Sequence, residues 1–189
     1  MSTGALQNLL LSKVRFEADE LEEIVDAFTQ REVKKGTRLL EAGKTCRTLW
    51  FIESGCARTF TETAQRDITS WFYPENQFLT SWHSYLLREP GFEGIEMLEN
   101  GNLLEISYEA MQDLYTRFSR FERFGRLLME EHLAFIDHFS RGYMFLSAKE
   151  RYQQLLISFP DIELRVKLGQ IASFLGISQE TLSRIRSGK

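Results

Sequence analysis

Cysteine, histidine and proline are scarce in this chain of 189 residues, and the first two shortages exclude whole classes of protein. There are two cysteines, three histidines and three prolines. Cys46 and Cys56 are too few for a disulfide framework, and their spacing matches no common zinc pattern. The histidines form no His-x-His or His-Glu-x-x-His group. We therefore expect reduced, half-buried thiols and no metal site. Because a nucleophile motif is also missing, we expect no enzyme.

Long apolar runs are missing as well. No stretch approaches the roughly 18 apolar residues that span a bilayer, and the N-terminus has no basic region followed by an apolar segment. The sequence therefore predicts a cytoplasmic protein without a membrane partner. With 43% hydrophobic and 13% aromatic residues, the chain can still bury one large core or two modest ones.

The net charge of −4 is small, but it is unevenly distributed. From residue 165 onward, five basic residues stand against Glu180 alone, which gives this segment a charge of +4 and leaves −8 for the rest. The basic residues are Arg165, Lys167, Arg184, Arg186 and Lys189. This asymmetry favours a C-terminal segment that faces an anion. A solvated terminal helix with incidental charges would show the same pattern.

The first half of the chain changes its period after a helical start. Residues 5–30 have apolar positions at helical spacing and predict one or two short amphipathic helices. Between residues 33 and 106, short β-type runs are separated by glycines and other turn residues. The expected strands cover residues 37–40, 49–52, 57–61, 68–72, 95–98 and 103–106. Several short strands at this spacing predict a sandwich, jelly roll or barrel.

After Ser107 the pattern is helical. A short helix over residues 108–117 precedes a long one, whose apolar stripe runs from Phe121 to Phe139 and is bounded by Gly142. Such a stripe either closes over the barrel or pairs with a second copy of itself, and it can do both along different parts of its length.

A further helix is predicted to start after Ser147. The Ser147 hydroxyl is placed to cap it, with Glu150 three residues later, and Pro160 stops it after Phe159. The boundary between sensor and effector parts is expected between Gly142 and Ser147.

The segment 168–186 is the strongest local signal. Ala172 supplies the small residue that two steeply crossing helices need, Gly176 tolerates the positive φ of a tight turn, and Ser178 suits the N-cap of the second helix. The apolar positions that would form one small core are Ile171, Leu175, Ile177, Leu182 and Ile185. Together these requirements predict a helix-turn-helix; an ordinary helical hairpin with a solvated polar face is the alternative.

The exposed face of the second helix carries hydrogen-bonding side chains suited to DNA. Arginine pairs with guanine, glutamine with adenine, and glutamate with the amino group of cytosine. The predicted base-reading residues are Gln179, Glu180, Ser183 and Arg184. The residues placed to contact phosphates are Lys167, Thr181, Arg186 and Lys189.

Five segments in order resemble the CRP/FNR regulators, in particular short members of the kind found in Bacteroidetes-type bacteria. The segments are Lys35-Gly-Thr-Arg-Leu-Leu-Glu-Ala-Gly43, Leu49-Trp-Phe-Ile-Glu-Ser-Gly-Cys-Ala-Arg58, Phe78-Leu-Thr-Ser81, Leu104-Glu-Ile-Ser-Tyr108 and Gly176-Ile-Ser-Gln-Glu-Thr-Leu-Ser-Arg-Ile185. The resemblance covers about residues 30–186.

The resemblance implies an α+β fold: a jelly-roll-like β-roll of the cyclic-nucleotide-binding type with flanking helices, a long dimerisation helix and a helical DNA-binding domain. The corresponding ranges are 1–118, 119–143 and 144–189. The implied protein is a homodimeric transcription regulator that binds specific sequences in double-stranded DNA. RNA polymerase is a further partner to consider. In such regulators the residues matching Gln179, Glu180 and Arg184 read bases, and those matching Lys167, Ser178 and Thr181 approach phosphates.

Two departures from the family pattern limit the effector. Cyclic-nucleotide binders carry a Gly-Glu pair for the ribose and an arginine for the phosphate, where this chain has Thr80-Ser81 and Phe92-Glu93-Gly94. An acid near a phosphodiester repels it, so we expect no cAMP. Two cysteines cannot supply the four thiolates of an iron–sulfur cluster. The sequence ends three residues after Arg186, so the β-hairpin wing of the family is not expected.

The interior of the roll has two interpretations. Large side chains can fill it, and Phe72, Phe78, Trp82, Phe92 and Met97 are the expected fillers. Alternatively, it holds an unidentified small effector, for which the candidate pocket is Thr80, Ser81, Trp82, Phe92 and Glu93, facing the long helix. For the whole chain, the alternative function is a sensor module that acts on a protein partner without useful DNA affinity.

Overall fold

The computed structural model describes residues 4–64 and 66–188. The helices are α1 (Gly4–Lys13), α2 (Ala18–Asp26), α3 (Trp82–Leu87), α4 (Tyr108–Arg117), α5 (Ser119–Phe145), α6 (Ala148–Ser158), α7 (Ile162–Arg165), α8 (Leu168–Leu175) and α9 (Gln179–Arg186). The strands are β1 (Thr29–Val33), β2 (Arg38–Leu40), β3 (Thr48–Ser54), β4 (Ala57–Glu62), β5 (Asp67–Tyr73), β6 (Phe78–Leu79), β7 (Gly94–Met97) and β8 (Gly101–Ser107).

Two four-stranded antiparallel sheets form the β-roll. One has the order β1-β8-β3-β6 and the other β2-β7-β4-β5. The core of the roll includes Phe51, Ile52 and Ile95, all fully buried; because Phe51 and Ile52 are neighbours in β3, that strand is covered on both faces. This arrangement confirms the predicted roll with flanking helices.

A close approach between two turns fixes one end of the roll. A Cβ at position 101 would lie 2.0 Å from the carbonyl oxygen of Ser54. Gly55, with φ at +94°, lies against the backbone of Asn100 on the other side of the same contact. Only glycine therefore fits at both positions, because any side chain would push the two turns apart.

The expected strands are present, but three elements escaped prediction. β1 buries only Val33 among its five residues, so it shows no alternation. β6 has two residues, and α3 is a single short helix next to it. The long helix also continues past Gly142, where the sequence analysis ended it. A Cβ there would meet nothing within 4 Å, so the glycine marks no close contact and no turn.

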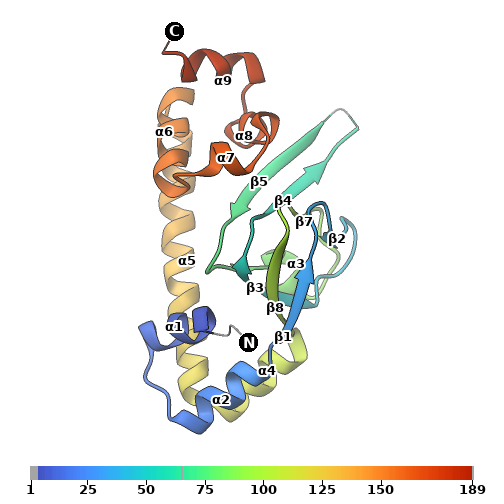
Figure 1. The fold of residues 1–189 in the computed structure, drawn as a ribbon, viewed down its shortest axis with the longest axis vertical. Helices are drawn as coiled ribbons and strands as arrows, with labels where there is room; N and C mark the ends of the chain where they lie inside the picture. The colour runs from blue at the N-terminus through green and yellow to red at the C-terminus, as the bar shows by residue number, and fades with distance from the viewer. Residues whose placement is uncertain (1–3, 65, 189) are drawn as a thin grey trace.

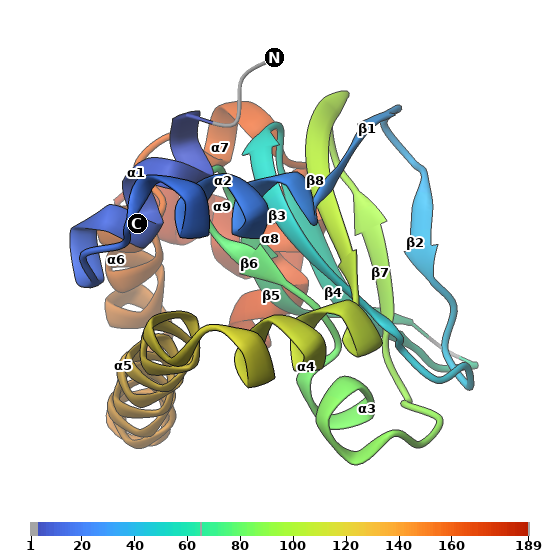
Figure 2. The ribbon, with the colours of Figure 1, turned by 90° about the horizontal axis from the view of Figure 1, so that it is seen from below.

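The helices divide into two groups at opposite ends of the molecule (Figure 1). α1, α2 and α4 lie at one end of α5, and α6 to α9 lie at the other. Seen from below, α5 runs beside the roll and α4 crosses under it (Figure 2). Only the start of α5 is buried, at Phe121, Phe124 and Gly125, so most of the helix keeps one side open.

The C-terminal helices pack on the outer side of β5. Rings from three helices contact Trp71: its centroid lies 4.9 Å from Phe139 of α5, 5.6 Å from Phe174 of α8 and 5.8 Å from Phe159 just after α6. The backbone N–H of Thr69 donates to the Ser173 hydroxyl of α8 at 2.9 Å. This aromatic cluster sets the position of the helix-turn-helix relative to the roll.

An arginine at the end of α7 adds a charged contact to the same junction. Arg165 donates to Glu75 at 2.6 and 2.9 Å and to Glu99 at 2.6 Å, and its side chain is 15% exposed. Glu75 also accepts from the backbone N–H of Gly55 at 2.9 Å. Arg165 therefore joins α7 to the roll. The sequence had placed it among the basic residues of a segment that faces an anion.

This junction makes stability depend on pH. Burial, the largest single effect, would raise the pKa of Glu75, but the hydrogen bonds and charge of Arg165 together with backbone N–H donors hold that pKa below its usual value. Glu75 then contributes stability that is present above the ordinary glutamate pKa and is lost as pH falls through the lowered one. In urea unfolding, the stability difference between wild type and Glu75→Gln should therefore shrink between about pH 5 and about pH 3.

The control is Glu22→Gln, which alters an exposed glutamate on α2. Its difference from wild type should stay constant over the same range. An equally constant difference for Glu75→Gln would contradict the ion-pair account.

Candidate nucleic-acid interface

α8 and α9 form the predicted helix-turn-helix. Gly176 ends α8 in the left-handed conformation, with φ at +67°, and the backbone N–H of Ile177 donates to the Ala172 carbonyl at 3.0 Å. Ala172 is 2% exposed and Leu182 is fully buried. The small residue, the glycine turn and the shared core all take the places that the sequence predicted for them.

Ser178 caps α9. Its hydroxyl accepts from the backbone N–H of Thr181 at 3.1 Å, and the two side-chain oxygens of this pair also lie 3.1 Å apart. The cap satisfies one of the free N–H groups at the start of the helix. It fixes the first turn of α9, from which Gln179 and Glu180 project.

The four predicted base-reading residues are all exposed on α9. The helix lies at the end of the molecule that is farthest from α2 and α4 (Figure 1). Gln179 folds back over α8, since a Cβ at position 169 would lie 2.6 Å from its Nε2 atom. Gly169 therefore leaves room for the amide, which also lines a crevice toward Asp67 and Glu96 of the roll. Glu180, Ser183 and Arg184 face solvent.

The predicted phosphate contacts fall into different settings. Lys167 is exposed before α8, and Thr181 is half-buried beside Ser178. Arg186 pairs with Glu163 of α7 at 2.6 Å, a contact between distant positions that no sequence pattern announced. Lys189 lies outside the described residues.

The candidate effector residues do not form one pocket. The Thr80 hydroxyl is buried and donates to the Thr48 carbonyl at 2.9 Å, and the Ser81 hydroxyl donates to Glu93 at 2.7 Å. Burial raises the pKa of Glu93, and the hydrogen bond from Ser81 opposes this only in part. Ser81 and Glu93, which the resemblance aligns with the ribose and phosphate contacts of cyclic-nucleotide binders, are thus hydrogen-bonded to each other.

Two expected fillers of the roll are elsewhere. Phe92 is 68% exposed, so it does not fill the interior of the roll. Phe72 is fully buried, but it lies with Phe159 and Phe174 in the junction with the C-terminal helices. The interpretation of both as interior residues is therefore wrong, whereas Phe78 and Met97 do belong to the core of the roll.

Both cysteines are buried free thiols. Burial raises the pKa of Cys56 to about 12, which keeps this thiol protonated. Across residues 4–64 and 66–188, no three histidine, cysteine or acidic side chains are grouped closely enough to hold a metal ion. In the same ranges, no helix is both long and apolar enough to cross a membrane.

No family model matches the chain. Among curated proteins, it is 26% identical over 194 residues to the fumarate and nitrate reduction regulatory protein of Vibrio cholerae, covering 89% of this chain and 71% of that one. The anaerobic regulatory protein of Pasteurella multocida is 26% identical over 183 residues, covering 89% and 65%. The Escherichia coli K12 fumarate and nitrate reduction regulatory protein is 27% identical over 195 residues, covering 89% and 71%.

Solved structures share the whole architecture. The c-di-GMP-responsive global regulator CLP of Xanthomonas campestris superposes with a TM-score of 0.70 at 19% identity, covering 91% of each chain. A transcriptional regulator of the CRP/FNR family from Eubacterium rectale gives 0.68 at 20% identity, covering 92% of this chain and 83% of that one.

The chain resembles regulators of the CRP/FNR type in sequence and in fold. Its curated relatives are named fumarate and nitrate reduction regulatory proteins or anaerobic regulatory proteins, and one of its fold neighbours is described as a transcriptional regulator of the CRP/FNR family.

The cap of α9 gives a stability prediction. Ser178→Ala removes the acceptor for the Thr181 N–H and should lower the free energy of unfolding by about 1 kcal/mol. Ser183→Ala, on the exposed face of the same helix, should change it by less than about 0.5 kcal/mol. Urea unfolding followed by circular dichroism measures both; equal losses would show that the Ser178 hydroxyl does not cap the helix.

Proposed function

We propose that this chain is a DNA-binding transcription regulator of the CRP/FNR type, a cytoplasmic homodimer that recognises a specific sequence in double-stranded DNA through α9. The observation that carries the proposal is the exposed face of Gln179, Glu180, Ser183 and Arg184 on a capped helix at the end of the molecule. Their donors and acceptors match base edges in the major groove. Lys167, Ser178, Thr181, Arg186 and Lys189 are the proposed phosphate contacts. RNA polymerase is a proposed further partner.

Dimerisation is proposed through the open side of α5. Large apolar side chains remain exposed along it: Leu133 (69%), Ile136 (46%), Met144 (81%) and Phe145 (85%). The spacing between the first three places them on one stripe of the helix, as in a helix pair. Two copies joined there would present two α9 helices to half-sites about 34–36 Å apart.

The effector is proposed to be something other than cAMP. A cyclic phosphate needs cations or N–H donors, and the Ser81–Glu93 pair brings a carboxylate to that place. Displacing the pair would leave a buried acid next to the phosphate, which is unfavourable for both groups.

A selection experiment tests the function. Purified protein is incubated with a randomised duplex library at two salt concentrations, and the retained DNA is sequenced. Enrichment of a two-fold symmetric motif with half-sites one helical turn apart is expected, with weaker retention at higher salt. A motif without two-fold symmetry would contradict the dimer, and no enrichment at either salt concentration would contradict sequence-specific binding by the effector-free protein.

Two substitutions separate base reading from phosphate contact. Arg184→Ala should relax preference at one position of each half-site, at a cost of about 1–3 kcal/mol for the best operator. Lys167→Ala should weaken all sequences alike and reduce the salt slope by about 1. Binding isotherms on matched and mismatched operators at several salt concentrations measure both effects.

The control for charge alone is Lys44→Ala, an exposed lysine on the roll. It should leave affinity and salt slope close to wild type. Unchanged sequence preference in Arg184→Ala would show that the assigned reading face is wrong.

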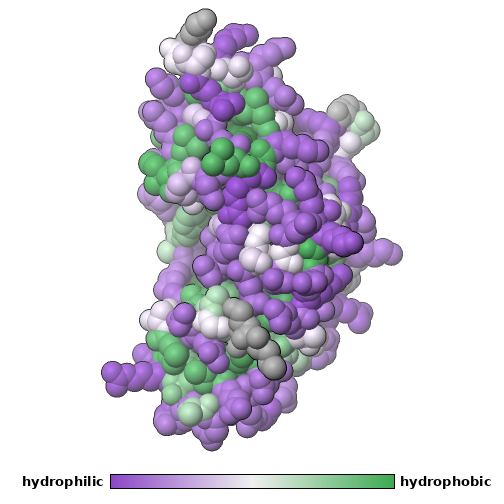
Figure 3. Space-filling view, in the orientation of Figure 1, coloured by the Kyte–Doolittle hydropathy of each residue, from purple (hydrophilic) through white to green (hydrophobic). Residues whose placement is uncertain are grey.

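A protein partner is the second candidate function, and one surface favours it. Hydrophobic side chains gather around α6 and α7 on the face shown in Figure 3, where Ile157 is 72% and Leu164 is 91% exposed. Such apolar surface is typical of protein contacts. Binding there would change little with salt, whereas DNA binding would weaken steeply.

A further inference from the structure

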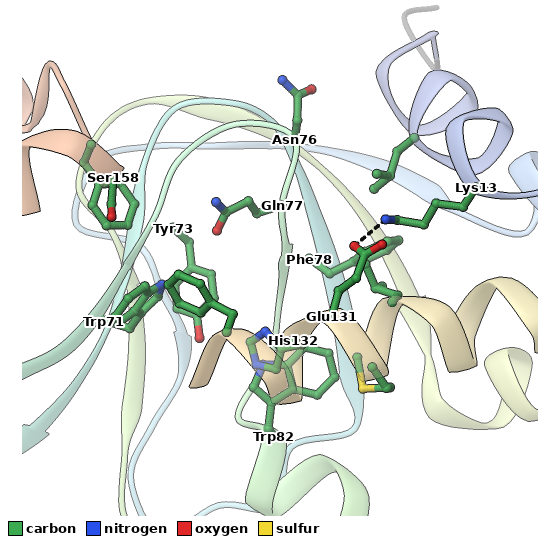
Figure 4. A pocket seen from close by; sticks show the side chains of 15 residues that line it. Lys13, Trp71, Tyr73, Asn76, Gln77, Phe78, Trp82, Glu131, His132 and Ser158 are labelled. Atoms are coloured by element: carbon green, nitrogen blue, oxygen red, sulfur yellow. Dashed lines mark hydrogen bonds and ion pairs between the residues drawn. The ribbon is translucent and has the colours of Figure 1, made fainter. Parts of the chain in front are cut away.

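A cavity of about 410 Å³ lies between α5 and the β5–β6 edge of the roll, with α1 on one side and the end of α6 on the other (Figure 4). Its volume falls in the range of small-molecule sites, about 300–1,000 Å³. The N-terminal helix contributes Leu9 and Lys13, and the end of α6 contributes Ser158 and Phe159. The cavity is therefore built by four separate parts of the chain.

Seven of the fifteen residues that line the cavity carry a ring. Trp71 and Tyr73 line it from β5, Phe135 and His132 from α5, and Trp82 from the start of α3. Figure 4 shows the rings of Trp71, Tyr73, Trp82 and His132 around a common space, with Gln77 reaching toward it from the loop before β6. Walls of this kind favour flat, apolar guests that stack or meet the rings edge to face.

The charged groups of the wall neutralise each other. Lys13 of α1 forms an ion pair with Glu131 of α5 at one end of the cavity. Burial lowers the pKa of His132, so this imidazole is neutral near pH 7, and burial raises the pKa of Tyr73, so this phenol stays protonated. A charged guest would thus lose hydration without gaining a partner.

The cavity differs from a cyclic-nucleotide site in its polar groups. Ser81 and Glu93 occupy the positions that the resemblance aligns with the ribose and phosphate contacts of cyclic-nucleotide binders. Neither residue lines this cavity, and their side chains are hydrogen-bonded to each other. We propose that the cavity binds an uncharged, planar aromatic effector of about two to three rings.

Trp71 connects this site to the DNA-binding helices. The same ring that lines the cavity meets Phe174 of α8 at 5.6 Å and Phe139 of α5 at 4.9 Å. A guest that shifts Trp71 therefore shifts the support of the helix-turn-helix, since a packed aromatic cluster cannot absorb the movement. This coupling rests on the DNA-binding function proposed above; the binding site itself does not.

Titration with N-phenyl-1-naphthylamine, an uncharged fluorescent aromatic amine, tests the site in the full chain. Saturable binding of one molecule per chain is expected. Gln77→Trp should fill the cavity from its exposed rim and weaken binding by about tenfold or more. The matched control Gln153→Trp, on the exposed surface of α6, should stay within about twofold.

A second variant and a second probe complete the test. Ser158→Trp blocks the cavity from α6 and should act like Gln77→Trp, and circular dichroism checks that each variant is folded. The anionic probe 1-anilinonaphthalene-8-sulfonate should bind about tenfold more weakly than the uncharged amine. Unsaturable binding, or affinity unchanged in both folded blocking variants, overturns the site; equal affinity for the anion overturns the uncharged class.

The coupling has its own readout. Saturating N-phenyl-1-naphthylamine should change affinity for the selected operator by about fivefold or more in wild type and not in Gln77→Trp. Bound amine with unchanged operator affinity overturns the coupling and leaves DNA binding intact. Failure of operator selection instead concerns the proposed function, because the amine titration requires no DNA.

Discussion

The contact of Trp71 with the C-terminal helices is the interaction on which the placement of the helix-turn-helix depends. One indole ring touches α5, α8 and the end of α6 within 4.9–5.8 Å between centroids. A helix-turn-helix as small as α8 and α9 has little core of its own, with Leu182 and Ile171 among its few buried side chains. It therefore depends on apolar contacts with the outer face of β5, and these contacts fix its orientation relative to that strand.

Charged contacts at the same junction restrict the relative orientation of the roll and the C-terminal helices. Arg165 reaches two carboxylates of the roll, and bidentate arginine–carboxylate geometry is far more directional than ring packing. The aromatic cluster supplies contact area, and Arg165 restricts which relative orientation of the two parts satisfies every partner. Both kinds of contact join the C-terminal helices to the roll next to β5.

Features set by neighbours in sequence were predictable, and those set by distant residues were not. The cap at Ser147, the turn at Gly176 and the cap at Ser178 each depend on a few adjacent residues, and all three are present. Phe92 and Phe72 were misplaced because hydrophobicity alone does not say which face of a roll a side chain occupies. The roles of Arg165 and Arg186 depend on Glu75, Glu99 and Glu163, whose proximity no local pattern encodes.

The pair between Arg186 and Glu163 gives this arginine an internal counterion. A DNA phosphate at Arg186 would replace a carboxylate that is already in place, so binding there would exchange one ion pair for another. The displaced Glu163 would keep its hydrogen bond from the Tyr152 hydroxyl, which lies 2.7 Å away. If the proposed phosphate contact forms, Arg186 would therefore add less net affinity than an arginine without an internal partner, because an existing ion pair has to be given up.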